Sequence, residues 1–140
     1  MIKDVLITIV GEQLIDDQSD KIELITDGKF GIKDGSYFIS YYDNKLADSP
    51  SSSKTIMYIK ENSVVIQRTG DFSSRLVVEK GTKNACLYST PHGDLTLSIF
   101  GKKIESNLNE KGGSLDLNYT IDANSKLLSQ NVVKISIREV

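Results

Sequence analysis

Apolar and polar residues alternate over long stretches of this chain, and the longest such stretch runs from Leu95 to about Leu108. Turn signals lie on both sides of it, at Pro91-His92-Gly93-Asp94 and at Gly112-Gly113. A period of two places successive side chains on opposite faces of a β-strand, whereas a helix needs a period of about 3.6. We therefore predict a long strand here, and no segment shows a convincing helical period.

Shorter alternating segments make up most of the remaining chain. Turn signals such as Asp34-Gly35 separate them at intervals of about 8 to 12 residues, which is typical of sandwiches and barrels. Residues 13–20 are polar and are predicted to form a loop, and Gly28 and Gly31 are predicted to bend or bulge their strand. The predicted strands span residues 3–12, 21–33, 36–43, 54–60, 63–69, 74–80, 84–90, 95–108, 114–122 and 127–140.

This number of strands favours a closed sheet. About nine or ten antiparallel strands in one open sheet would leave long unpaired edges, and closure removes them. We therefore predict an all-β fold, an antiparallel barrel of about 8 to 10 strands that forms a single domain over residues 1–140. The strand that begins at Lys3 is predicted to pair with the one that ends at Val140.

The composition is that of a soluble, cytoplasmic protein. With 140 residues the chain can bury a core without cross-links. A net charge of −2 argues against a general nucleic-acid or anionic-membrane binder. The single cysteine, Cys86, permits no internal disulfide and favours a reducing compartment. The apolar run near the N-terminus is too short for a membrane span and indicates a strand rather than a signal peptide.

Several segments together resemble a family of small uncharacterised bacterial proteins. The resemblance rests mainly on Tyr88-Ser-Thr-Pro-His-Gly-Asp-Leu95, on Glu110-Lys-Gly-Gly-Ser-Leu115 and on Tyr119-Thr-Ile-Asp122, with weaker similarity at Asp4-Val-Leu-Ile7. The family is DUF1934, a calycin-like β-barrel domain of unknown function. The resemblance implies a lipocalin-like barrel with a cavity and implies no activity. The usual form of the family has tyrosine at the position of His92.

No catalytic or metal-binding constellation is predicted. His92 lies in a Pro-x-Gly turn beside Asp94, and without a nucleophile and an orienting acid we expect an exposed turn residue. Cys86 is expected to be a buried, small apolar residue of a strand. The acidic group at residues 16–20 lacks the glycine and terminal glutamate of a calcium loop, so we expect a solvated loop, no metal and no cofactor.

Arg68 is the first candidate for ligand binding. It shares its strand face with Val64 and Ile66, and if that face is the lumen, the guanidinium group points into the barrel. A buried guanidinium group needs partners, which are either a ligand carboxylate or phosphate, or Glu79 and backbone carbonyls. Arg75, on the next predicted strand, is expected on the outer face.

Aromatic residues form the second group of candidates. Barrel pockets combine apolar walls with a few polar tips, and tyrosine supplies both. The alternative is ordinary core, because side chains fill many small barrels. The candidate ligand-binding set is Arg68, Phe30, Tyr37, Tyr41, Tyr88 and Tyr119.

Two functions are compatible with these features. The first is a non-enzymatic barrel that binds a small amphipathic or anionic ligand at one mouth, with the loop at residues 48–53 as a lid. The alternative is a protein-interaction or regulatory domain, or a homodimer, with a filled barrel and no ligand. A hydrolase or isomerase ranks last, because it would need a pocket that joins His92 to an acid and a hydroxyl group.

Overall fold

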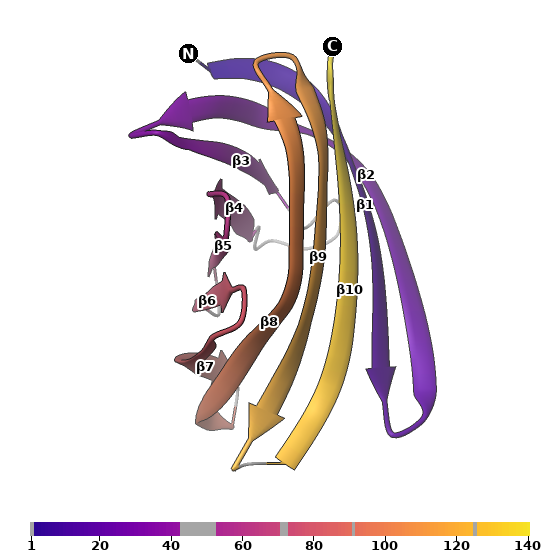
Figure 1. The fold of residues 1–140 in the computed structure, drawn as a ribbon, viewed down its shortest axis with the longest axis vertical. Coiled ribbons are helices and arrows are strands. Elements are labelled where there is room, and N and C mark those ends of the chain that lie inside the picture. Colours follow the sequence, from indigo (N-terminus) through magenta and orange to yellow (C-terminus); the bar gives the residue numbers. More distant parts are fainter. Residues whose placement is uncertain (1, 43–52, 71–72, 91, 125) are drawn as a thin grey trace.

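Ten antiparallel strands form the protein, and Figure 1 shows them in a computed structural model that describes residues 2–42, 53–70, 73–90, 92–124 and 126–140. No helix occurs in these ranges, and therefore none that is long and apolar enough to cross a membrane. The strands are β1 Ile2–Ile15, β2 Gln18–Lys33, β3 Ser36–Tyr42, β4 Lys54–Ile59, β5 Ser63–Thr69, β6 Ser74–Glu79, β7 Lys83–Thr90, β8 Gly93–Asn109, β9 Gly112–Ala123 and β10 Lys126–Glu139.

The strands form a closed barrel, as predicted. Each strand pairs with its neighbour in the chain, and β1 pairs with β10 to complete the ring. The β1–β10 register runs from Val5 opposite Glu139 to Leu14 opposite Gln130. The predicted pairing of the two terminal strands is therefore confirmed, and it pairs the two strand edges that an open sheet would leave exposed at its ends.

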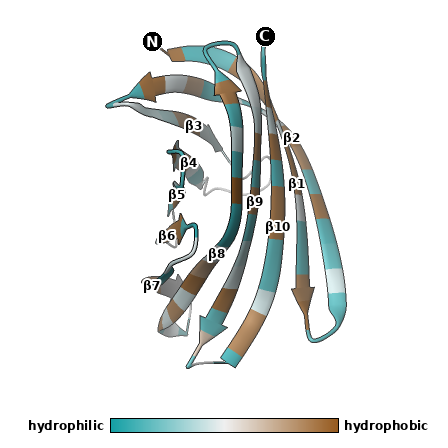
Figure 2. Ribbon diagram, in the orientation of Figure 1, coloured by the Kyte–Doolittle hydropathy of each residue, from teal (hydrophilic) through white to brown (hydrophobic). Residues whose placement is uncertain are grey.

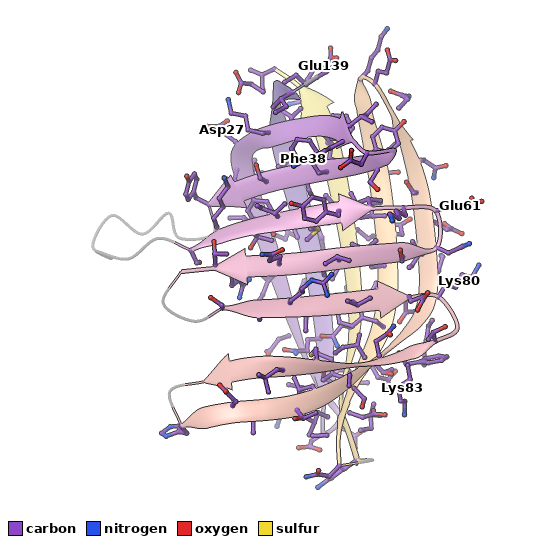
Figure 3. All side chains as sticks on the ribbon, turned by 90° about the vertical axis from the view of Figure 1, so that its left-hand side faces the viewer. Asp27, Phe38, Glu61, Lys80, Lys83 and Glu139 are labelled. Carbon is purple, nitrogen blue, oxygen red and sulfur yellow. The ribbon has the colours of Figure 1, made fainter. Side chains whose placement is uncertain are left out.

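The barrel has a wall of long strands and a wall of short ones. In Figure 1 the long strands β1, β8, β9 and β10 run from top to bottom, whereas the short strands β4 to β6 are seen nearly end-on. Figure 3 shows the short strands lying across the long ones. β2 curves from one wall to the other in Figure 1 and pairs with β3 from Lys29 to Lys33, and its register with β1 contains no bulge at Gly28 or Gly31. The two irregularities in register lie instead between Gly101 and Lys103 and between Leu127 and Ser129.

The seam between β6 and β7 is the shortest in the barrel. A single residue pair, Ser74 and Tyr88, joins the two strands. At the other end of β6, the main-chain N–H of Gly81 donates a 2.8 Å hydrogen bond to the carbonyl oxygen of Gly101 on β8. A Cβ atom at Gly101 would collide with the carbonyl group of Glu79, so glycine is needed for this close approach.

One apolar core lies inside the barrel. Alternate residues of each strand point inward, and Figure 2 shows the resulting succession of hydrophobic and hydrophilic residues along the long strands. Burying these side chains is the main favourable term in folding, at about 25 cal/mol per Å² of apolar surface. The largest fully buried side chains belong to Phe30, Ile7, Ile39, Ile59, Ile99, Leu115, Leu117 and Ile135.

The predicted loop at residues 13–20 is wrong. β1 continues to Ile15 and β2 begins at Gln18, so Asp16 and Asp17 alone turn the chain. Their φ angles are 48° and 63°. Two-residue hairpin turns require this left-handed conformation, and aspartate tolerates it better than most residues do. The acidic residues therefore mark a tight turn between two long strands.

The second predicted turn, at Gly112-Gly113, is displaced by two residues. Glu110 and Lys111 form the turn, and the two glycines open β9. Their φ angles of 122° and 133° are rarely accessible to other residues. A Cβ atom on Gly113 would also collide with the carbonyl oxygen of Asn107 on β8. Both backbone conformation and space therefore require glycine here.

This requirement predicts a difference between two glycine substitutions. Gly113→Ala should lower the free energy of unfolding by about 2 kcal/mol or more, because it adds backbone strain and a clash. Gly11→Ala is the matched control, because no atom lies within 4 Å of the added Cβ. It should change stability by about 0.5 kcal/mol or less. Urea unfolding measures both, and equal effects would contradict the assigned role of Gly113.

Candidate functional site

A cavity of about 680 Å³ opens at one end of the barrel lumen. Binding sites for small molecules typically have volumes of about 300 to 1,000 Å³, so this cavity has the size of a ligand site. Its lining combines aliphatic side chains with hydroxyl, amide and guanidinium groups from both walls. In Figure 1 the two walls curve around the interior in which this cavity lies.

The short strands contribute a row of polar side chains. Tyr41 of β3 faces Thr55 of β4, which faces Arg68 of β5, which in turn faces Ser74 of β6. All four residues line the cavity. The same strand faces carry core residues further along, such as Met57, so the row lies on the lumen side. The sheet register thus places Arg68 over the cavity.

The long strands contribute a second polar group on the opposite wall. Tyr119 of β9 faces Asn131 of β10, which faces Gln13 of β1. The amide Nδ2 of Asn131 donates a 3.0 Å hydrogen bond to Oγ of Ser129, and both residues are buried. This bond fixes the orientation of the amide, because buried polar groups are costly without partners. The cavity therefore has polar groups on both walls.

Arg68 and Tyr119 interact electrostatically across the cavity. Burial raises the pKa of the Tyr119 hydroxyl group above its ordinary value of 10.0, and the positive charge of Arg68 partly opposes this increase in pKa. Tyr119 is therefore a neutral hydroxyl donor at physiological pH. A guanidinium group and a neutral phenol together can bind an oxyanion, because both donate hydrogen bonds.

The remaining lining of the cavity is mostly aliphatic. Side chains such as Ile9, Ile66 and Val133 cover the inner wall. At the mouth, Ile15 and Ile22 of the β1–β2 hairpin and Leu128 of β10 line the cavity but are 42%, 67% and 40% exposed. The cavity therefore offers an apolar surface that continues from the polar groups to the rim.

Phe30 and Tyr37 lie away from this cavity. Their rings stack with centroids 5.7 Å apart and planes 5° from parallel. Phe30 is fully buried, and Tyr37 lines a smaller pocket of about 460 Å³ at the other end of the lumen. Of the predicted ligand-binding set, the structure thus brings together Arg68, Tyr41 and Tyr119, and places Phe30 and Tyr37 in a separate cluster.

Two further sequence predictions fall outside what the structure describes. The main chain of Tyr88 pairs with Leu95 and Ser74, but its side chain is not among those described. The predicted lid at residues 48–53 lies outside the described residues, except for Ser53. The lining residues that the structure describes all belong to strands.

The residues considered for catalysis do not converge on the cavity. His92 is exposed in the turn before β8. Cys86 is half-buried against the core, and burial raises the pKa of its thiol, although a main-chain hydrogen bond with Leu97 acts in the opposite direction. A thiol of this kind is a weak nucleophile at neutral pH. Within the described part of the chain, no three His, Cys, Asp or Glu residues are grouped so as to hold a metal ion.

Sequence reasoning missed the polar neighbours of Arg68. Thr55 could have been found from the hairpin of the predicted strands at 54–60 and 63–69. If its turn is centred on residues 61–62, Thr55 lies directly opposite Arg68, as it does in the structure. Ser129 and Asn131 follow the irregularity in register between Leu127 and Ser129. A simple alternation pattern therefore cannot assign their faces.

The fold and site define a ten-stranded antiparallel barrel with a polar-lined cavity in its lumen. The chain belongs to the DUF1934 family, described as a domain of unknown function, whose sequence pattern matches residues 7–135. The resemblance seen in the sequence is thus confirmed.

Two comparisons lead to the same relative. The chain is 27% identical over 115 residues to the uncharacterised β-barrel protein YwiB of Bacillus subtilis (strain 168), covering 81% of this chain and 79% of YwiB. It is also similar to the crystal structure of the ywiB protein from Bacillus subtilis, with a TM-score of 0.80 and 22% identity. That match covers 96% of this chain and 92% of the other, and it supports the barrel fold.

Because Tyr119 is buried, we expect the protein to lose stability at high pH. Tyr119 loses its proton near pH 10 in the unfolded chain, but only at higher pH in the folded protein. Above about pH 10 the unfolded state therefore binds fewer protons, and the free energy of unfolding falls as pH rises. Urea unfolding between about pH 9 and 11 should show a smaller decline for Tyr119→Phe than for the wild type.

A second substitution separates the effect of Arg68 on the pKa of Tyr119 from the effect of burial on that pKa. Arg68→Met removes the charge that favours the phenolate, so the pKa of Tyr119 should rise further. Ultraviolet titration of the tyrosines, with Tyr119→Phe used to assign the signal, measures this change. An unchanged or lower pKa would show that the two groups do not interact in solution.

Proposed function

We propose that this protein is a non-enzymatic, calycin-like binding barrel of the cytoplasm, which holds a small amphipathic anion in its lumen. The observation that carries the proposal is the cavity in which Arg68 and the neutral Tyr119 hydroxyl group share a largely aliphatic lining. A single cysteine among 140 residues is compatible with a reducing compartment.

The polar end of the cavity favours an anionic group. Arg68 offers a planar fork of donors, which suits a carboxylate or a phosphate. Tyr41, Thr55 and Tyr119 add hydroxyl groups to the same lining. The two acids of the lining, Glu12 and Asp20, belong to the β1–β2 hairpin. Like charges repel, so the anionic group should bind beside Arg68 and away from this hairpin.

The apolar surface favours a ligand with a hydrocarbon part. Ile15, Ile22 and Leu128 expose a substantial part of their surface at the mouth. Covering about 100 Å² of apolar surface is worth about 2.5 kcal/mol. A ligand whose apolar part extends from the lumen over this rim would gain this binding free energy, whereas a small inorganic anion would not.

Three probes with one hydrocarbon tail and different head groups test this proposal. Delipidated protein should bind dodecanoate in isothermal titration calorimetry, dodecanol more weakly and dodecylamine least, because only the carboxylate is attracted to Arg68. Arg68→Leu should weaken dodecanoate binding by about 10- to 100-fold, the value of a charge-assisted hydrogen bond. It should leave the affinity for dodecanol nearly unchanged.

Arg75→Leu is the matched control for this experiment. Arg75 is exposed on β6 and pairs with Gln67, one residue before Arg68, so its side chain points to the outer face. Its removal should leave dodecanoate binding unchanged. The proposal would be contradicted if the three probes bound with equal affinity, or if Arg68→Leu and Arg75→Leu weakened dodecanoate binding equally. Circular dichroism spectra should confirm that both variants remain folded.

A further inference from the structure

A further hollow lies on the outside of the barrel, away from the lumen. It has a volume of about 540 Å³ and is formed by Ile2, Lys29, Ile32, Lys33, Phe38, Ser40, Lys54, Ile56 and Tyr58, which we call the outer groove. Figure 3 looks onto the outer face of β2 to β6, where Phe38 is labelled. None of the nine residues lines the cavity of the lumen.

The register of the sheet explains why this face is hollow. Ile2 faces Gly31, and Gly31 faces Phe38, which in turn faces Tyr58. In the next row, Ser40 faces Ile56 on β4. Gly31 and Ser40 are too small to fill their positions, so a depression remains between the larger apolar side chains around them.

The floor of the groove is more apolar than an outer barrel face requires. Phe38, Ile56 and Tyr58 are only half-buried, and Ile2 and Ile32 are 65% and 39% exposed. Single exposed apolar residues are common on protein surfaces, but a contiguous group that forms a hollow is typical of an interaction site. A partner would therefore gain free energy by inserting a large apolar side chain here.

The charged residues that line the groove itself have one sign, although Asp4 and Asp27 lie beside it. Its three charged residues are all lysines, although the chain contains 19 acidic and 17 basic residues. Lys29 is paired with Asp4. Lys33 and Lys54 make no ion pair with the described residues, and Nζ of Lys54 lies 5.8 Å from the ring centroid of Tyr42. Within the part of the chain that the structure describes, these two lysines are therefore not neutralised by a carboxylate.

We propose that the outer groove binds an acidic polypeptide segment that inserts a large apolar side chain between Phe38, Ile56 and Tyr58 and places carboxylates beside Lys33 and Lys54. Nucleic-acid binding draws much of its affinity from neutralised phosphates, and the three lysines of this groove, one of them paired with Asp4, offer few such contacts. Two copies of the chain joined through their grooves would bring like charges together. Charge complementarity therefore favours an acidic peptide over both.

The test is an NMR titration of the full-length, ¹⁵N-labelled protein with the acetylated and amidated peptide Glu-Asp-Glu-Leu-Phe-Glu-Asp-Glu. We expect a Kd on the order of 100 µM, as for a small interface. Amide signals of Gly31, Phe38 and Tyr58 should shift, while those of Arg68 and Tyr119 should not. One matched peptide carries Ser-Ser in place of Leu-Phe and another carries glutamine in place of every acid, and both should bind at least about 10-fold more weakly.

Charge-reversal variants identify the lysines that bind the peptide. Lys33→Glu combined with Lys54→Glu should weaken peptide binding by about 10-fold or more. Lys126→Glu combined with Lys134→Glu makes the same change in net charge on β10, outside the groove, and should leave the affinity nearly unchanged. Raising the salt concentration to about 0.5 M should also weaken binding to the wild type.

Several results would overturn the proposal. The first is that no amide signal shifts at about 2 mM peptide. The second is that the Ser-Ser peptide binds as tightly as the Leu-Phe peptide. The third is that the two double variants lose the same amount of peptide affinity. An oligothymidylate that shifts the same amides more strongly than the peptide would assign the groove to nucleic acid. A dimer in analytical ultracentrifugation that Phe38→Ala dissociates would assign it to a second copy of the chain.

Discussion

The ladder between β1 and β10 is the interaction on which the rest of the molecule depends. It joins the two ends of the chain over the register from Val5–Glu139 to Leu14–Gln130 and turns a ten-stranded sheet into a ring. Closure gives every strand an inner and an outer face, and buries residues such as Ile7 and Ile135 on the inner one. Without this ladder both terminal strands would expose unpaired backbone groups, which is a common route to aggregation.

Both candidate sites arise where small or polar residues occupy positions that large apolar residues fill elsewhere. In the lumen, Phe30 and Ile39 fill one half of the barrel, whereas Thr55, Ser74 and Arg68 leave the other half open. On the outside, Gly31 and Ser40 leave a hollow between larger side chains. Both hollows expose apolar surface to water, so a ligand or partner that covers this surface gains free energy at about 25 cal/mol per Å². The two candidate sites lie on opposite faces of the same short strands.

The strands were predictable because period-two alternation and turn residues are local signals, and the closure was predictable because about ten strands in an open sheet would leave long unpaired edges. It failed at the tip of the β1–β2 hairpin, where Asp16 and Asp17 suggested a loop although they form a two-residue turn. The candidate site was only partly predictable. Arg68 was found because a charge interrupts an apolar face, but the partners on the opposite wall, such as Asn131, depend on a register that an irregularity shifts. Phe30 and Tyr37 were grouped with Arg68 because alternation assigns a face and carries no information about depth along the lumen.

The most direct test of the ligand-binding account is native mass spectrometry of the protein purified under gentle conditions from its own host. The account predicts a reproducible additional mass that is lost on denaturation and is absent from Arg68→Leu purified in the same way. The value of that mass would begin to identify the ligand. A single unliganded mass for the wild-type monomer would contradict the account and would favour a barrel that acts through its outer surface alone.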